Sequence, residues 1–267
     1  MRALAVAAAL GIVAVLFVLP LAAVFVEALR HGATAALASL ADPDALSAIR
    51  LTAVVGLVSV CVNTVFGVAA AWCLTKHDFR GRWLLVTLIE LPLSVSPVIS
   101  GLVWILVFGS QGWLGGFLRA WGLQVVFATP GIVLATLFVT FPFVVRPLLP
   151  LMQEQGRQQE EAAVLLGAGL WQTFRHVTLP NIRWGLLSGV LLCNARAMGE
   201  FGAVSVVSGH IPGLTETMPL RIESLYNDYQ GPAAFAMSVL LAGLALLTLA
   251  AKAALEWRIG RRSTLPA

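Results

Sequence analysis

Residues 160–180 read EEAAVLLGAGLWQTFRHVTLP, and this polar segment interrupts an otherwise apolar chain. Within it, Glu161-Ala162-Ala163 is followed by Gly167 after three residues, and the segment Val177–Pro180 follows after nine more. The good helix formers over 157–166 predict a short helix. We expect Gly167 to end it, because glycine accepts the left-handed conformation that closes a helix.

The composition on either side of this segment indicates an integral membrane protein. Of the 267 residues, 59% are hydrophobic and only 11% are charged, with a mean hydropathy of +0.89. Ordinary soluble domains carry about 25% charged residues. A chain of this length holds several spans of about 20 residues each, surrounded by membrane lipid.

Several other classes of protein are excluded by the pattern of charged and metal-binding residues. The formal net charge of +4 comes without a basic, aromatic-interleaved stripe, so we expect no nucleic-acid partner. The cysteines lie in apolar segments without CxxC spacing, and the histidines fall in four different loops, so neither a disulfide framework nor a metal centre is expected. These residues are Cys61, Cys73, Cys193, His31, His77, His176 and His210.

Six apolar segments predict an all-α membrane protein with a single permease domain over 1–267. In lipid the backbone must satisfy its own hydrogen bonds, so segments of this length are expected to be helices. The first is too long for the apolar region of a signal peptide, which spans about 7–15 residues, and we interpret it as a retained helix. The predicted spans cover about 3–29, 48–75, 83–108, 126–149, 184–208 and 232–257.

The distribution of Lys and Arg predicts the orientation of these spans. Twelve of the 17 basic residues fall on one side, four fall on the other, and Arg196 lies inside a span. Basic loops favour the cytoplasm, so both termini and the loop over 150–183 are expected there. The twelve are Arg2, Lys76, Arg80, Arg82, Arg146, Arg157, Arg175, Arg183, Lys252, Arg258, Arg261 and Arg262.

The order E-A-A-x3-G-x9-[I/V]-x-L-P resembles the cytoplasmic signature of binding-protein-dependent ABC importer permeases. The resemblance implies a type I (MetI-like) permease with a coupling helix between spans four and five that docks on an ATPase. The only departure is Val177, where the family usually has Ile. A helix that merely connects two spans remains the alternative. The residues implied in docking are Glu160, Glu161, Ala162, Ala163 and Gly167.

The chain lacks the residues that bind a nucleotide triphosphate. A P-loop requires G-x-x-x-x-G-K-[S/T], and neither Lys76 nor Lys252, the only lysines, follows a glycine. We therefore expect no cofactor on this chain, with ATP and Mg²⁺ used by a separate ATPase.

The sequence of the fifth span narrows the resemblance to permeases for one class of substrate. Residues 195–202 read ARAMGEFG, which looks like the A-R-A-x-G-E-[F/Y]-G pattern of sulfate and molybdate permeases. The stretches 40–44, 94–98, 142–146, 181–184 and 203–209 are similar to CysW-type subunits of sulfate/thiosulfate importers. This resemblance implies a second, CysT-like permease, two ATPase subunits and a periplasmic sulfate-binding protein. A molybdate or tungstate permease is the alternative.

Two groups of residues are candidates for the translocation path. Arg196 and Glu200 are four residues apart and share a helix face, so they are expected either to lock the bundle as a neutral pair or to help a dianion through. Pro92 and Pro97 are expected to interrupt the third span and expose backbone groups, either for an anion or as a kink. The hydroxyls nearby are Ser94, Ser96 and Ser100.

A non-catalytic subunit is the expectation for this chain. An intramembrane serine hydrolase would need a base beside its serine, yet no histidine falls within a predicted span and G-x-S-x-G is absent. An uncoupled channel would leave the polar segment over 160–180 without a role.

Overall fold

The computed structural model describes residues 6, 11–30 and 32–263, and these residues form helices and loops without a strand. Two of the helices, η1 and η2, are π-type turns joined to longer α-helices. The elements in chain order are η1 (Ala14–Val18), α2 (Leu19–Leu29), α3 (Ala33–Leu40), α4 (Pro43–Lys76), α5 (Arg82–Ser94), α6 (Pro97–Phe108), α7 (Gly115–Ala120), α8 (Thr129–Thr140), α9 (Pro142–Gln155), α10 (Gln158–Leu165), α11 (Leu170–Thr173), η2 (Phe174–Thr178), α12 (Leu179–Met198), α13 (Gly202–Val207), α14 (Met218–Asn227) and α15 (Gly231–Ser263).

The number of candidate spans is smaller than the six predicted. Within the described residues, four continuous helical stretches are long and apolar enough to cross a membrane, and a bent pair could provide a fifth. Most of residues 3–10, where the first predicted span begins, lie outside the described part. The four stretches are Gly11–Leu29, Pro43–Lys76, Thr129–Gln155 and Gly231–Trp257.

The predicted third span, 83–108, is broken into α5 and α6, which meet at 112°. The residue before a proline is pushed out of the helical region, and Ser96, which precedes Pro97, accordingly has ψ of 132°. Val95 is extended as well, with ψ of 139°. Pro97 then starts α6. Pro92 was also expected to interrupt the helix, but it lies buried inside α5 without ending it.

The predicted fifth span, 184–208, is also broken. Helix α12 ends at Met198, and α13 starts at Gly202 after a short non-helical link. Asn181, Arg183 and Arg196 make α12 too polar to count among the candidate spans by composition. The interruption at Pro97 was predicted, whereas the break after Met198 was not, because apolar residues continue across it.

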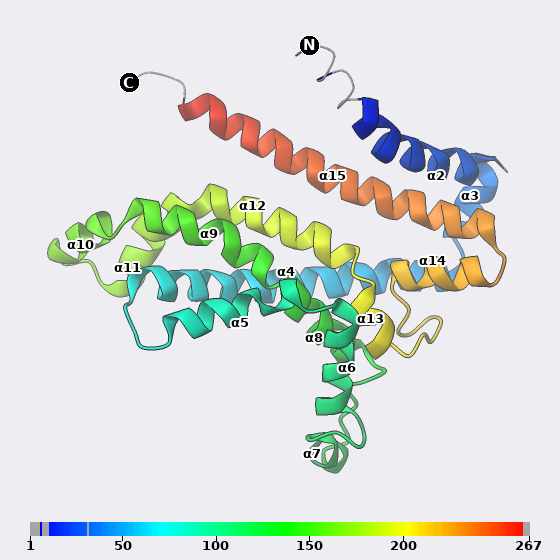
Figure 1. Ribbon diagram of the computed structural model, residues 1–267, viewed down its shortest axis with the longest axis horizontal. Coiled ribbons are helices and arrows are strands. Elements are labelled where there is room, and N and C mark those ends of the chain that lie inside the picture. Colours follow the sequence, from blue (N-terminus) through cyan, green and yellow to red (C-terminus); the bar gives the residue numbers. More distant parts are fainter. Residues whose placement is uncertain (1–5, 7–10, 31, 264–267) are drawn as a thin grey trace.

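The first of three buried apolar clusters lies where α4, α9 and α12 pack together (Figure 1). Leu74, Leu148 and Ile182, one from each helix, are fully buried there. Glycine allows the close approach: a Cβ on Gly67 would stand 2.8 Å from a methyl of Val144. Small residues at such contacts are typical of helices that associate in membranes.

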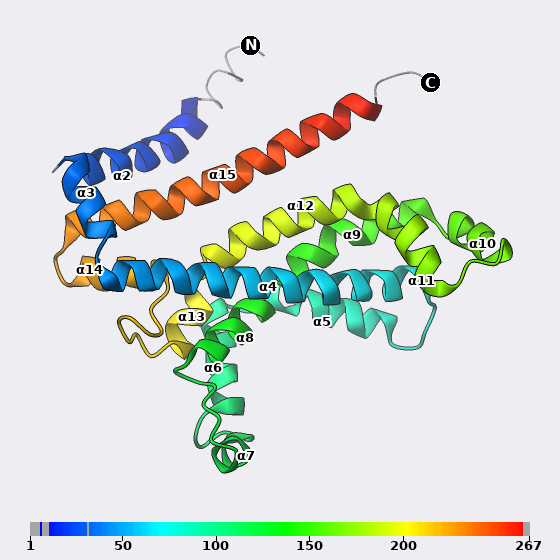
Figure 2. The same ribbon diagram turned by 180° about the vertical axis from the view of Figure 1, so that it is seen from behind.

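The elements with predicted functions occupy separate parts of this bundle. Helices α10 and α11 lie at one end of the long axis, and α3 and α14 lie at the other (Figures 1 and 2). Helices α6 and α7 project sideways as an arm, and α15 runs beside α2 across the outside. The break between α12 and α13 is at mid-molecule, well away from α10.

Candidate functional site

Helix α10, Gln158–Leu165, corresponds to the short helix predicted over 157–166. Glu160 and Glu161 lie in its first turn, where the helix dipole favours acidic side chains. At its other end, Gly167 has a φ of +88°, and its N–H donates to the carbonyl of Val164. The N–H of Ala168 reaches back to Ala163, which completes the paired bonds of a glycine-terminated helix. The predicted helix and its terminator are confirmed.

Glu160 faces the bundle. One carboxylate oxygen forms a 3.1 Å ion pair with Lys76 at the end of α4, and the other accepts a 2.6 Å hydrogen bond from the hydroxyl of Thr178. The ammonium of Lys76 also donates to the backbone carbonyl of Gly156. The two charged side chains are only 8% and 17% exposed. Glu160 therefore fixes α10 against α4 and the start of α12.

Glu161 and its neighbours face outward. Glu161 and Ala162 are exposed, and Ala163 is partly buried. Beyond them, Leu165 and Leu166 are 88% and 89% exposed, and Leu170 and Trp171 are exposed as well. We call the outward surface formed by Glu161, Ala162, Leu165, Leu166, Leu170 and Trp171 the coupling tip. An exposed apolar patch with an acidic neighbour is suited to binding another protein.

The loop that carries the coupling tip is held by further polar contacts. Arg157 forms a 3.2 Å ion pair with Asp78, in the loop between α4 and α5. The amide of Asn181 donates to Gln159, and Gln155 donates to the backbone carbonyl of Asn181. These contacts tie α9, α10 and α12 to one another, so the coupling tip stands on a fixed base.

Arg196 and Glu200 meet at the break between α12 and α13. Their charged groups are 2.5 Å apart, and the Glu200 side chain is 1% exposed. Its second oxygen accepts the N–H of Ala203 in the first turn of α13 at 3.0 Å. This geometry supports the holding role of the pair, because both charges are neutralised where the chain turns. Their role in translocation stays a prediction.

The three serines around the other break bond to their own helices or lie at a turn. The hydroxyl of Ser94 donates to the carbonyl of Leu91, and that of Ser100 donates to the carbonyl of Ser96. Ser100 is buried, whereas Ser94 is exposed. A function of these residues in the path remains a prediction.

The two breaks lie against each other. A Cβ on Gly202, at the start of α13, would stand 2.9 Å from Pro97 at the start of α6. One on Gly101 would stand 2.7 Å from the carbonyl of Ala203. The structure thus brings α6 and α13 together, although the sequence separates their starts by about 100 residues.

Two polar clusters were not identified from the sequence. Buried Asn63 on α4 donates to Thr140 at 2.8 Å and to the carbonyl of Leu137, so it joins α4 to α8. At the α14 end, Arg221 contacts Glu216 at 3.3 Å and Asp44 at 3.5 Å. A lone amide inside an apolar run was the available signal for Asn63, because polar groups in lipid require a partner.

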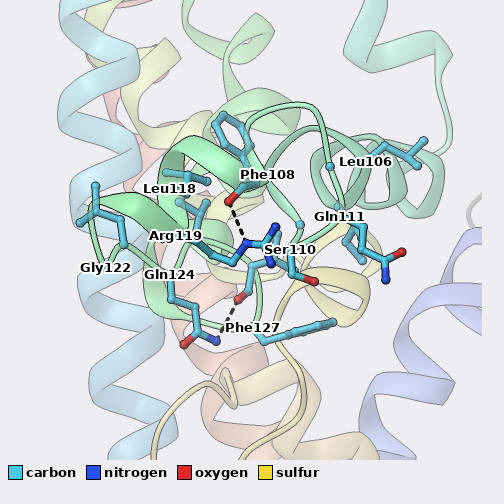
Figure 3. A pocket seen from close by; sticks show the side chains of 16 residues that line it. Leu106, Phe108, Ser110, Gln111, Leu118, Arg119, Gly122, Gln124 and Phe127 are labelled. Carbon is cyan, nitrogen blue, oxygen red and sulfur yellow. Dashed lines mark hydrogen bonds between the residues drawn. The ribbon is translucent and has the colours of Figure 1, made fainter.

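A cavity of about 720 Å³ lies in the arm, between α6, α7 and the loop before α8 (Figure 3). Its polar side chains are those of Ser110, Gln111, Arg119 and Gln124. Arg119 and Gln124 donate to the backbone carbonyls of Gly115 and Val126. The arm also exposes Trp113 and Trp121, aromatic residues that suit a membrane interface. The predicted site residues are not among those lining this cavity.

Comparison with known proteins accounts for this architecture. Residues 63–261 match the family described as binding-protein-dependent transport system inner membrane component. The chain is 53% identical to the sulfate transport system permease protein CysW of Escherichia coli (strain K12) over 246 residues, which cover 92% of this chain and 84% of that protein. It is 49% identical to the CysW protein of Synechocystis sp. over 262 residues, covering 98% and 95%.

A solved structure shares the fold. A chain in the crystal structure of a bacterial alginate ABC transporter, in complex with an alginate pentasaccharide-bound periplasmic protein, superposes with a TM-score of 0.77. The match covers 97% of this chain and 95% of that chain at 17% identity. The family match over residues 63–261 and the two CysW relatives show that the present chain belongs to the binding-protein-dependent transport system inner membrane component family.

Proposed function

We propose that this chain is the permease subunit of an ATP-driven importer whose substrate is sulfate, with thiosulfate as a second candidate. The observation that carries the proposal is the similarity over nearly the full length to two CysW sulfate permeases. The sequence ARAMGEFG at 195–202 is compatible with sulfate or molybdate, so the relatives favour sulfate over the molybdate alternative.

The energy enters through the coupling tip. A separate pair of ATPase subunits binds ATP and Mg²⁺, and the exposed leucines and Trp171 provide the apolar anchors that such an interface needs. Glu161 is free of intramolecular ion pairs among the described residues, so it is available to a basic group of the ATPase. Glu160 is already paired and stays with the permease.

Movement of the ATPase pair reaches the bundle through the Lys76–Glu160 pair. This pair and the Thr178 hydrogen bond connect α10 to the ends of α4 and α12. A displacement of α10 therefore pulls on two of the helices that form the core. Rigid-body displacement of packed helices is a common way to alternate access between the two sides of a membrane.

The arm supports a second permease as partner. Helix α6 and the loop and helix that follow leave the bundle sideways, and Leu102, Val103 and Leu106 on α6 are exposed. A CysT-like permease packed along the arm covers these side chains. A periplasmic sulfate-binding protein then delivers the anion at the α3–α14 end, opposite the coupling tip.

The basic residues support this orientation after one adjustment. Four of the counted residues lie within the continuous candidate stretches, Lys76, Arg146 and Lys252 on the side of the coupling tip and Arg50 on the other. The remaining nine against three still favour a cytoplasmic coupling tip and cytoplasmic termini.

Reconstitution tests the proposed substrate. The chain is assembled with a CysT-like permease, the ATPase pair and the binding protein in proteoliposomes, and uptake of ³⁵S-sulfate is followed with ATP and Mg²⁺. We expect ATP-dependent uptake that excess unlabelled sulfate abolishes and molybdate leaves intact. Uptake blocked by molybdate at lower concentration than by sulfate would contradict the proposal.

A further inference from the structure

Arg146 is a charged side chain inside a candidate membrane span. It lies on α9, nine residues before the end of the helix at Gln155, or about 14 Å along the helix axis. Arginine at such a depth is costly in lipid and normally faces a partner or a water-filled cavity. Among the described residues, Arg146 has no ion pair and no hydrogen bond, although its side chain is exposed at the surface of the single chain.

Arg146 lines three cavities, of which two are large enough for an anion. One, of about 430 Å³, is lined by Arg146 together with Thr87, Glu90 and Ser94 of α5. The other, of about 350 Å³, continues from Arg146 and Pro142 to Leu192 on α12. The side chain of Arg146 on α9 therefore lies beside α5 and α12, on a face of the bundle that is open in the single chain.

The contrast with Arg196 identifies which arginine can receive an anion. The guanidinium of Arg196 is 2.5 Å from Glu200, so its charge is already neutralised within the chain. Arg146 shares a cavity with Glu90, but no ion pair joins the two among the described residues. The planar set of N–H donors of Arg146 matches two oxygens of a tetrahedral oxyanion.

The other polar groups of the 430 Å³ cavity suit a transient site. The Ser94 hydroxyl, now bonded to the carbonyl of Leu91, lies in the same cavity and can turn toward an anion. Glu90 also lines it without an ion pair among the described residues. A carboxylate beside the arginine weakens the hold on a dianion, and a transport site must release what it binds.

We propose that Arg146, in the cavity that it shares with Ser94 and Glu90, forms a transient binding site for the sulfate dianion on its way through the permease. This inference rests on the proposed function, because it takes the substrate from there. The second permease closes the open side of the cavity.

Three variants test the inference in the full reconstituted complex: Arg146→Gln, Arg146→Lys and Glu90→Gln. Uptake of ³⁵S-sulfate and ATP hydrolysis are measured together across a range of sulfate-loaded binding protein. Arg146→Gln should lower the sulfate imported per ATP by at least 10-fold, and Arg146→Lys should restore part of it. Glu90→Gln should lower the maximal rate and KM together, because the anion leaves more slowly. Arg80→Gln, at an exposed arginine in the loop between α4 and α5, is the matched control.

The outcomes separate the inference from the proposed function. Wild-type uptake by Arg146→Gln would overturn the role of Arg146 while leaving the substrate assignment intact. Failure of Arg146→Gln to assemble with the second permease would also overturn it, because the arginine would then serve the subunit interface. If the wild-type complex imports no sulfate, the proposed function itself fails.

Discussion

Two of the ion pairs in this chain, Glu160 with Lys76 and Glu200 with Arg196, differ in their surroundings. At the coupling tip, Glu160 is paired with Lys76, while the adjacent Glu161 faces solvent. At the break between α12 and α13, Glu200 is paired with Arg196 and no exposed acidic residue lies beside it. The Lys76–Glu160 pair fixes α10 and leaves the surface beside it free to bind a partner. The Arg196–Glu200 pair fixes the break between α12 and α13 and has no comparable surface beside it.

This difference indicates which of the two regions can bind the ATPase and receive its motion. A group that is fully buried and paired stabilises one geometry, whereas an exposed apolar patch next to a free charge gains by binding. The coupling tip combines a fixed base with a free surface. The break at Glu200 has the ion pair but no comparable free surface, so we interpret it as a rigid joint between α12 and α13.

The largest expected effect comes from charging the coupling tip. The double change Leu165→Asp and Leu166→Asp places two carboxylates in the apolar part of the ATPase interface. Loss of such anchors costs about 3 kcal/mol, so association with the ATPase should weaken by roughly 100-fold. Co-purification of ATPase with the permease pair measures this. Tyr229→Asp, an equally exposed position at the opposite end, should leave the yield of complex unchanged.

Removing Glu200 should reduce stability rather than ATPase binding. Glu200→Ala leaves Arg196 without its partner and the N–H of Ala203 without its acceptor. We expect a loss of about 2 kcal/mol, reduced from the value for a fully buried pair because Arg196 is partly exposed. Thermal unfolding of the detergent-purified permease pair reports it. Glu200→Gln keeps an acceptor for Ala203 and should lose less; equal stability of all three proteins would contradict the holding role.

Exchanging the charges of Lys76 and Glu160 should reveal their coupling. Each single change, Lys76→Glu or Glu160→Lys, places like charges together and should lower sulfate uptake several-fold. The double change restores the pair and should recover most of the activity, with an interaction energy of about 1 kcal/mol. Uptake per ATP hydrolysed is the readout. Additive losses in the double variant would show that the pair does not act as a unit.

The smallest effect is expected at the end of α10. Gly167→Ala meets no neighbour, so its only penalty is the left-handed backbone, which costs a non-glycine residue about 1 kcal/mol. The coupling tip should fray slightly and uptake should fall two- to three-fold. Gly116→Ala on α7, with open space and no left-handed backbone, is the control and should have no effect.

Local features of this fold were predictable from the sequence. Pro97 indicated an interruption of the third span, and α6 does begin at this residue. Gly167 indicated the end of α10, and it adopts the left-handed conformation. Each of these depends on the backbone preferences of a single residue, which do not change with the rest of the chain.

Features that depend on distant parts of the chain were not predictable. Nothing local distinguishes Glu160 from Glu161; the difference arises because Lys76 arrives from α4 on one side only. The break after Met198 was not predicted, because apolar residues continue across it; the Glu200 contacts and the packing of α6 against α13 stabilise the chain there.

Site-specific crosslinking tests the central claim most directly. A photoreactive amino acid replaces Leu166 in the full complex, and the crosslinked partner is identified by mass spectrometry. We predict an adduct with the ATPase subunit, whereas the same label at Tyr229 gives none. A crosslink from position 166 only to lipid or to the second permease would contradict the claim that energy enters this chain at the coupling tip.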